Sequence, residues 1–296
     1  MNRANALRVL DEIAADQAGL VTAAQATARG IDRVTQLRLC QANLVESVGR
    51  GVYRVAGAAA PSHLDSRVVW LRLDPGRPAW ERTGLGAKDG VISHRAACLL
   101  HELGDVPAPK VELTVPRRRT TREPGVRLHV GRLTPEDVTI VDGLPVTTVA
   151  RTVVDLLRTH ADGGHVGGVI ADAEQRNLVN LDSLGERVGQ FANRYGLSGA
   201  SGDELLSALV EQGGRRLARD NVRESTKLAG LSGLFEGYRL AQPNIPALDA
   251  LRALAAGPEF TETIRRLLEP MTGLRTPETG SILSPTLMQT LRKLSS

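Results

Sequence analysis

The stretch that decides the fold is TAAQATARGIDRVTQLRLCQA, residues 22–42. Thr22 and Gln25 have the spacing of a capping box, in which both side chains serve free backbone N–H groups at the start of a helix. Gly30 suits the left-handed turn that ends this short helix, and Asp32 can cap the next one. Two short helices joined by a glycine turn are typical of a helix-turn-helix unit.

The residues on either side extend this unit to a winged helix. Leu7, Leu10 and Ile13 recur at helical spacing and predict a first helix that ends near residue 16. Residues 44–55, LVESVGRGVYRV, read as a strand, a tight glycine turn and a second strand. A hairpin at this place is a wing, so we expect a winged helix-turn-helix domain over residues 1–58.

The third predicted helix and the wing carry side chains of the types that bind nucleic acid. If Val34, Leu37 and Leu44 face inward, with Cys40 beside them, the outward face is polar and basic. A wing tip can reach a phosphate or a minor groove. We predict DNA contacts from Arg33, Thr35, Gln36, Arg38, Arg50 and Arg54. The alternative is a small helical unit whose winged helix is only a scaffold for protein interactions.

Composition limits the class of protein. Hydrophobic residues make up 42% and charged residues 24% of 296, which is ordinary for globular chains and excludes a wholly disordered one. No apolar run is long enough for a membrane span, and two cysteines cannot form a disulfide scaffold. Asp11 and Glu12 fall where a signal peptide would need an apolar core. We therefore expect a cytoplasmic protein.

The positive charge lies in the first half of the chain. The net charge is +4 overall, with +2 in residues 1–60, +3 in residues 61–160 and −1 in residues 161–296. Only four of the 37 basic residues are lysine, and arginine suits bidentate contacts to phosphate and guanine. This asymmetry favours a polyanionic partner for the first half.

Residues 61–160 predict a mixed α/β region. Residues 111–115 and 126–130 both alternate with strand period, and we interpret them as a hairpin. Residues 110–132 carry a net charge of +5. This patch predicts a second contact to the DNA backbone or a landing site for an acidic partner, and the alternative is a solvated loop. Its arginines are Arg117, Arg118, Arg119 and Arg122.

One helix of this region places His94, Cys98, His101 and Glu102 on one face. Zinc has to be considered, but the spacing is not that of a HExxH site, and the apolar neighbours of Cys98 favour packing. We therefore predict no metal site. Arg151 and Asp155 stand four residues apart on a later helix, where they can pair with each other or with a neighbouring element.

Residues 161–296 predict a mainly helical region. Residues 162–168, DGGHVGG, lack the lysine and the preceding strand of a phosphate loop and read as a connector. A regulator's dimer interface is one use for this region. The expected helices cover residues 169–178, 181–195, 202–212, 217–228, 247–256, 259–268 and 285–294. The whole chain is therefore predicted as α/β (α+β), with domains at 1–58, 61–160 and 161–296.

No pattern in the sequence indicates catalysis. Metal-assisted nucleases need clustered carboxylates with a lysine, but neither Lys227 nor Lys293 has the Glu-x-Lys spacing. There is also no nucleophile elbow, phosphate loop or dinucleotide fingerprint. We predict a protein that is not an enzyme and has no cofactor.

Three segments in one order resemble a known family. They are GVYR at 51–54, ISHRAACLLHEL at 92–103 and VTTVARTVVD at 146–155. Together they resemble the AbiEi antitoxins of type IV toxin–antitoxin systems, in the form with an N-terminal winged helix. The resemblance covers roughly the first 160 to 190 residues, and the arginine-rich composition is similar to that of mycobacterial members.

The resemblance implies a DNA-binding antitoxin that represses its own operon by binding inverted repeats in the promoter. A neighbouring gene would encode a nucleotidyltransferase-like toxin, and the C-terminal region would counter that toxin. The DNA contacts carried over fall on the third helix and the wing, at Arg33, Gln36, Arg38, Arg50 and Arg54. The alternatives are a stand-alone winged-helix transcription regulator and a protein-interaction adaptor that binds no DNA.

Overall fold

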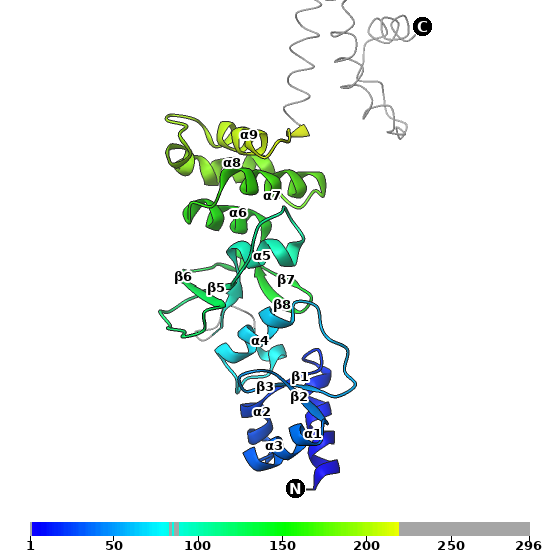
Figure 1. Cartoon of the computed structure of the whole chain (residues 1–296). Helices are drawn as coiled ribbons and strands as arrows, with labels where there is room; N and C mark the ends of the chain where they lie inside the picture. The colour runs from blue at the N-terminus through cyan, green and yellow to red at the C-terminus, as the bar shows by residue number, and fades with distance from the viewer. Residues whose placement is uncertain (1, 83–84, 86–88, 219–296) are drawn as a thin grey trace, which may run out of the picture. The chain divides into compact units, whose positions relative to one another are not determined.

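The computed structural model describes residues 2–82, 85 and 89–218, which form a mixed α/β structure (Figure 1). The prediction of an α/β chain is confirmed, and its N-terminal helices and strands are compatible with a winged helix. This first part consists of α1 (Arg3–Ala15), β1 (Leu20–Thr22), α2 (Ala23–Ala28), α3 (Arg33–Gln41), β2 (Val45–Gly49) and β3 (Val52–Val55).

Local signals set the helix ends of the winged helix. The predicted capping box at Thr22 and Gln25 is present at the start of α2. The carboxylate of Asp32 accepts the backbone N–H of Thr35 at 2.9 Å and so caps α3. The strands pair antiparallel in the order β1-β3-β2, and the sequence did not predict β1. Leu10, Ile31 and other apolar side chains fill the core between helices and sheet.

The middle part holds a five-stranded sheet with the order β6-β5-β4-β8-β7. Two of its neighbouring pairs, β4 with β8 and β5 with β6, are parallel. Its elements are α4 (Leu64–Leu73), η1 (Ala79–Glu81), β4 (Val91–Ile92), α5 (His94–His101), β5 (Val111–Val115), β6 (Val126–Val130), η2 (Pro135–Asp137), β7 (Val138–Val141), β8 (Leu144–Thr147) and α6 (Val149–Arg158).

The predicted hairpin at residues 111–130 is wrong. Val111 lies opposite Val126 and Val115 opposite Val130, so β5 and β6 run in the same direction. Residues 116–125 therefore form a crossover between the end of one strand and the start of the next, and they are not the tip of a hairpin. The alternation of side chains has a period of two in both kinds of pair, so it could not reveal the strand direction.

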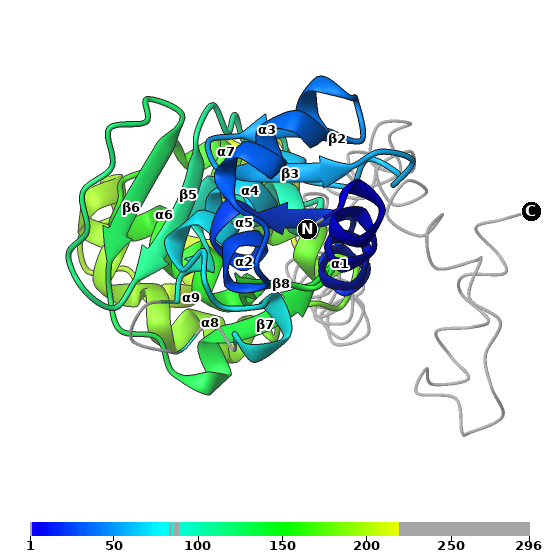
Figure 2. The same cartoon turned by 90° about the horizontal axis from the view of Figure 1, so that it is seen from below.

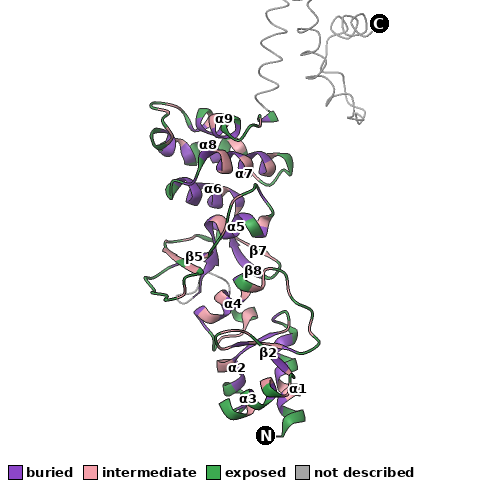
Figure 3. Cartoon of the chain, viewed as in Figure 1, coloured by how far each residue is buried: buried purple, intermediate pink, exposed green. Residues whose placement is uncertain are grey.

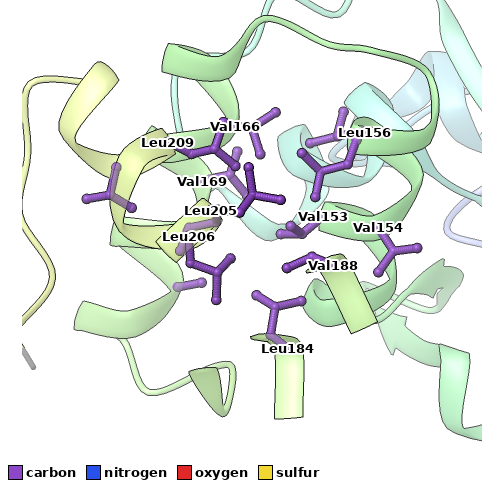
Figure 4. Close-up of a cluster of buried hydrophobic side chains, with 14 of the residues drawn as sticks. Val153, Val154, Leu156, Val166, Val169, Leu184, Val188, Leu205, Leu206 and Leu209 are labelled. Carbon is purple, nitrogen blue, oxygen red and sulfur yellow. The ribbon is translucent and has the colours of Figure 1, made fainter. Parts of the chain in front are cut away.

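The described chain ends in a group of helices, α7 (Gly163–Gln175), α8 (Leu181–Val188), η3 (Gly189–Tyr195) and α9 (Gly202–Gln212). Their core also includes side chains from α5 and α6, among them Cys98 and Val153. Figure 4 shows Val153 beside Val188 and other side chains of this core. This core therefore crosses residue 160, and residues 1–218 form one compact unit. The three-domain division remains a prediction.

The predicted connector at residues 162–168 is wrong for most of its length, because α7 begins at Gly163 after its cap Asp162. The glycines serve close helix contact. A Cβ atom on Gly167 would lie 1.9 Å from the carbonyl oxygen of Leu209 in α9. A larger residue would thus push α7 and α9 apart.

Several expected helices cannot be compared with the structure. Those over residues 217–228, 247–256, 259–268 and 285–294 lie outside the described residues, apart from residues 217 and 218. Among the described helices, none has the length and apolar character that a membrane crossing requires.

Buried polar contacts join the winged helix to the segment that follows α4. Gln25 Nε2 donates to the carbonyl of Arg77 at 3.1 Å, and the Ala79 N–H donates to Gln17 Oε1 at 2.9 Å. Leu20 and Val52 of the small sheet pack in one apolar cluster with Trp70 of α4. Figure 2 shows the structure from the side on which α1, α2 and α3 lie, and these helices are drawn in blue. These contacts leave α3 outside the shared core.

Candidate nucleic-acid interface

The exposed face of α3 is the central feature of the candidate interface. Arg33, Val34, Leu37, Arg38 and Gln41 are all exposed. They stand at positions i, i+1, i+4, i+5 and i+8, which lie on one side of a helix. Figure 3 shows this side of α3 in the colour of exposed residues. The face thus combines two arginines, one amide and two aliphatic side chains.

The predicted orientation of α3 is wrong in part. Val34 and Leu37 were expected inside, yet each is 58% exposed. Gln36 was expected outside, yet it is only 4% exposed and donates to the carbonyl of Ile31 at 2.9 Å. The helix is rotated relative to the prediction because the amide of Gln36 satisfies buried backbone groups where α2 meets α3.

Thr35 is half-buried and belongs to the helix cap. Its hydroxyl donates to Asp32 Oδ2 at 3.0 Å, and its backbone N–H donates to Asp32 Oδ1. The hydrogen bond from the backbone N–H of Thr35, and to a smaller extent that from its hydroxyl, lowers the pKa of the Asp32 carboxyl below its usual value. The hydroxyl of Thr35 is thus engaged within the protein, unlike the side chains of the exposed face.

Three arginines of the winged helix are free to bind an anion. Within the described ranges, the side chains of Arg33, Arg38 and Arg50 make neither a hydrogen bond nor an ion pair. Arg50 stands in the turn between β2 and β3, where Gly51 has a φ of +73° that favours glycine. The wing tip and α3 therefore each offer unpaired guanidinium groups.

Arg54 differs from these three arginines. It lies opposite Glu46 in the β2–β3 pair, and its Nη2 atom is 2.5 Å from Glu46 Oε2. The charge of Arg54 is thus partly neutralised within the hairpin. A nucleic-acid contact at Arg54 would have to compete with this carboxylate.

The second predicted basic surface lies on the crossover between β5 and β6. Arg117, Arg118 and Arg122 are exposed, and their side chains have no partner among the described residues. Arg119 instead donates to the carbonyl of Leu73 at 2.6 Å. Arg72 of α4 pairs with Glu123 of the same crossover. Two anchors therefore fasten this segment to α4, while three cations point to solvent.

The helix α5, which carries His94 and Cys98, contributes to a small cluster of polar side chains. Cys98 is buried, and burial raises the pKa of its thiol to about 12. His94 instead stacks on His129, with ring centroids 3.6 Å apart and planes 13° apart, and His129 Nε2 lies 2.5 Å from Glu112. Within the described residues, His94, Glu112 and His129 are the group with the spacing of metal ligands.

The geometry of this cluster favours a hydrogen bond between His129 and Glu112 over a metal ligand set. An imidazole binds a metal along the lone pair in its ring plane, and two stacked rings direct their lone pairs in parallel planes. His94 Nδ1 lies 2.9 Å from Ser93 Oγ, which also accepts the hydroxyl of Thr114. As the rings lie, they do not converge on one ion.

A buried charge network holds the end of the sheet to α6. Arg151 Nη1 lies 2.6 Å from Asp137, and Arg151 Nε lies 3.0 Å from Asp155. The pair predicted within one helix therefore exists, and Arg151 has a tertiary role as well. Burial raises the pKa of Asp155 and outweighs the attraction of Arg151 and Arg158. No pattern in the sequence predicted that Asp137 would join this network.

The geometry of residues 2–58 is compatible with a winged helix that has an exposed basic helix, α3, and a basic turn between β2 and β3. Comparisons with known proteins agree with this interpretation. Residues 8–56, which cover most of the winged helix, match a family described as "Transcriptional regulator, AbiEi antitoxin". For these residues the resemblance found in the sequence is confirmed, and the match supports a DNA-binding regulator or antitoxin.

Other comparisons add less. The crystal structure of the Rv2827c protein from Mycobacterium tuberculosis is similar at 17% identity, with a TM-score of 0.43. The similarity covers 70% of this chain and 76% of that chain. A search of curated proteins found no match.

Proposed function

We propose that this chain is a DNA-binding antitoxin of a type IV toxin–antitoxin pair and represses its own operon. In this proposal the winged helix binds inverted repeats in the promoter, in the cytoplasm, without catalysis. The observation that supports it most is the pair of arginines, Arg33 and Arg38, on the exposed face of a capped helix, neither of which has a partner among the described residues. The family match at residues 8–56 supports the same function.

The predicted contacts fall into two kinds. Arg33 and Arg38 on α3 would contact base edges in the major groove, where arginine binds guanine in a bidentate manner. Arg50 at the wing tip would bind the phosphate backbone or a minor groove. Thr35 and Gln36 are left out of the base-contacting set, because the hydroxyl of Thr35 is bonded to Asp32 and Gln36 is buried with its amide nitrogen bonded inside the domain.

The crossover arginines would add a second phosphate contact. A set of phosphate contacts makes affinity fall with salt, with a slope in log K of about −0.9 for each contact. Replacing Arg117, Arg118 and Arg122 by glutamine should flatten this slope and weaken all sequences alike. An unchanged slope of log K against log salt would show that the crossover arginines do not contact phosphate and that this segment is a solvated loop.

The toxin partner is the finer part of the proposal. Expression of the neighbouring gene should arrest growth, and co-expression of this chain should restore it. A reporter gene behind the chain's own upstream region should be repressed by wild type and released by the Arg33→Ala/Arg38→Ala variant. Repression without any rescue of growth would favour a stand-alone regulator, which is the second candidate because the family match covers the winged helix alone.

The third candidate is a protein-interaction adaptor. The exposed aliphatic residues Val34 and Leu37 favour it, because such patches also mark protein interfaces. Full repression of the reporter by the Arg33→Ala/Arg38→Ala variant would show that these two arginines of α3 are not needed for DNA recognition. Loss of partner binding in a Leu37→Ala variant, with no binding to any DNA, would then support the adaptor.

A further inference from the structure

The exposed face of α3 contains two aliphatic side chains that polar DNA contacts do not explain. Val34 and Leu37 are each 58% exposed and stand three residues apart, so they are neighbours on one helix surface. Arg33 directly precedes Val34 in the sequence, and Arg38 directly follows Leu37. Aliphatic residues at the centre of a basic helix face are exposed to water at a cost in free energy, unless a partner covers them.

The polar groups that remain on this face are few. The hydroxyl of Thr35 is bound to Asp32, and the amide of Gln36 is bound to backbone groups inside the domain. The face therefore presents guanidinium groups, the amide of Gln41 and aliphatic carbon. In the major groove, only the 5-methyl group of thymine offers an apolar surface to such a helix.

We propose that Val34 and Leu37 read thymine by direct contact with its 5-methyl group in the major groove. This inference rests on the proposed DNA-binding function and adds a sequence preference to it. Arg33 and Arg38 would position α3 on the DNA through their charge. Val34 and Leu37 would then select the bases that lie between the two arginine contacts. DNA is favoured over a second copy of this chain because a copy would bring the same unpaired cations to the interface.

Helix geometry predicts where the thymines lie. Three residues along an α-helix span about 4.5 Å, and successive base pairs are about 3.4 Å apart. Val34 and Leu37 should therefore contact methyl groups on the same or on adjacent base-pair steps of one half-site. The preferred DNA should contain one or two thymines there, beside the guanines that the arginines would contact.

The test uses full-length protein and a duplex of its own upstream region. Each thymine is replaced in turn by deoxyuridine, which keeps the base pair and the charge and removes only the methyl group. Loss of one buried methyl group should weaken binding by about fourfold at one or two neighbouring positions. In the Leu37→Ala and Val34→Ala variants, the same replacement should change affinity by less than about twofold.

Leu99→Ala is the matched control, since Leu99 is also a helical leucine and is 56% exposed. This variant should keep the full sensitivity to deoxyuridine. Selective promoter binding with no sensitivity at any thymine would overturn the inference and leave the proposed function intact. Full sensitivity in a Val34→Ala/Leu37→Ala double variant would overturn it as well. Absence of binding to any duplex would overturn both.

Discussion

The exposed face of α3 and the buried charge network around Arg151 use arginine in opposite ways. In the winged helix, the buried polar side chains are uncharged, those of Gln17, Thr22, Gln25 and Gln36. Arg33 and Arg38 are exposed and have no partner among the described residues. In the middle region, arginines such as Arg151 are buried and paired with carboxylates. The comparison indicates that the partners of an arginine, and not the number of arginines, distinguish the surface proposed to bind DNA from the buried network.

The largest expected effect comes from the buried arginine. Arg151→Ala should lower the free energy of unfolding by about 3–5 kcal/mol, because it leaves the carboxylates of Asp137 and Asp155 buried without their main cation. Urea denaturation measures this change. Arg158→Ala is the control, and it should cost about 1 kcal/mol or less because that side chain is 53% exposed. Equal stability of Arg151→Ala and wild type would refute a structural role for Arg151.

The exposed arginines should show the reverse pattern. Each of Arg33→Ala and Arg38→Ala should weaken binding to the promoter by about 1–3 kcal/mol if the side chain reads a base. The unfolding free energy should stay within about 0.5 kcal/mol of wild type.

The matched control for these variants removes equal charge from α1. Arg3 and Arg8 are both exposed on that helix and lie outside the predicted DNA-contacting set. An Arg3→Ala/Arg8→Ala variant should keep its sequence preference and lose little affinity. If the Arg3→Ala/Arg8→Ala and Arg33→Ala/Arg38→Ala variants lose equal affinity, the net charge of the protein and not the face of α3 explains DNA affinity.

Gln36 tests the corrected orientation of α3. Gln36→Ala should cost about 1–3 kcal/mol of stability, because its Nε2 atom donates to three oxygens, including the carbonyl of Ile31, in a buried site. Where the variant is folded, its DNA preference should be that of wild type. A loss of preference for one base pair, with unchanged stability, would restore the original prediction that Gln36 reads DNA. Gln41→Ala, at an exposed position, is the stability control.

Acid should weaken the middle region, where the imidazole of His94 is buried. Burial, the charge of His129 and nearby arginines lower the pKa of His94 to about 3. The unfolded chain takes up this proton near pH 6.5, so stability should fall as the pH drops from about 6.5 towards 3. The slope from this group is at most about 1.4 kcal/mol per pH unit.

His94→Asn isolates this contribution. Asparagine tolerates the φ of +55° at this position and lacks the titrating ring. Urea midpoints between pH 7 and pH 4 should therefore fall less steeply in the variant than in wild type. Parallel curves would show that the imidazole of His94 is protonated alike in both states.

Local signals in the sequence predicted the short helices of the N-terminal part well. The capping box of Thr22 and Gln25 and the cap at Asp32 act within one helical turn, so the sequence alone locates the ends of α2 and α3. The rotation of α3 was predicted wrongly because apolar residues were assumed to face inward. Val34 and Leu37 break that rule on the face proposed for binding.

Contacts between distant segments could not be predicted. Strand alternation at residues 111–115 and 126–130 does not distinguish a parallel pair from a hairpin. The glycines of residues 163–168 resemble a connector until α9 is placed against Gly167. Asp137 and Arg187 join Arg151 only through the tertiary fold. These features depend on contacts with segments distant in sequence, which no local sequence pattern identifies.

The most direct test of the central claim is a fluorescence anisotropy titration with the upstream duplex and a scrambled duplex of equal length. Wild type and the Arg33→Ala/Arg38→Ala variant are compared at several salt concentrations. We predict a clear preference of wild type for the upstream duplex, and loss of that preference in the variant. Equal, weak binding of both proteins to both duplexes would contradict sequence reading by α3.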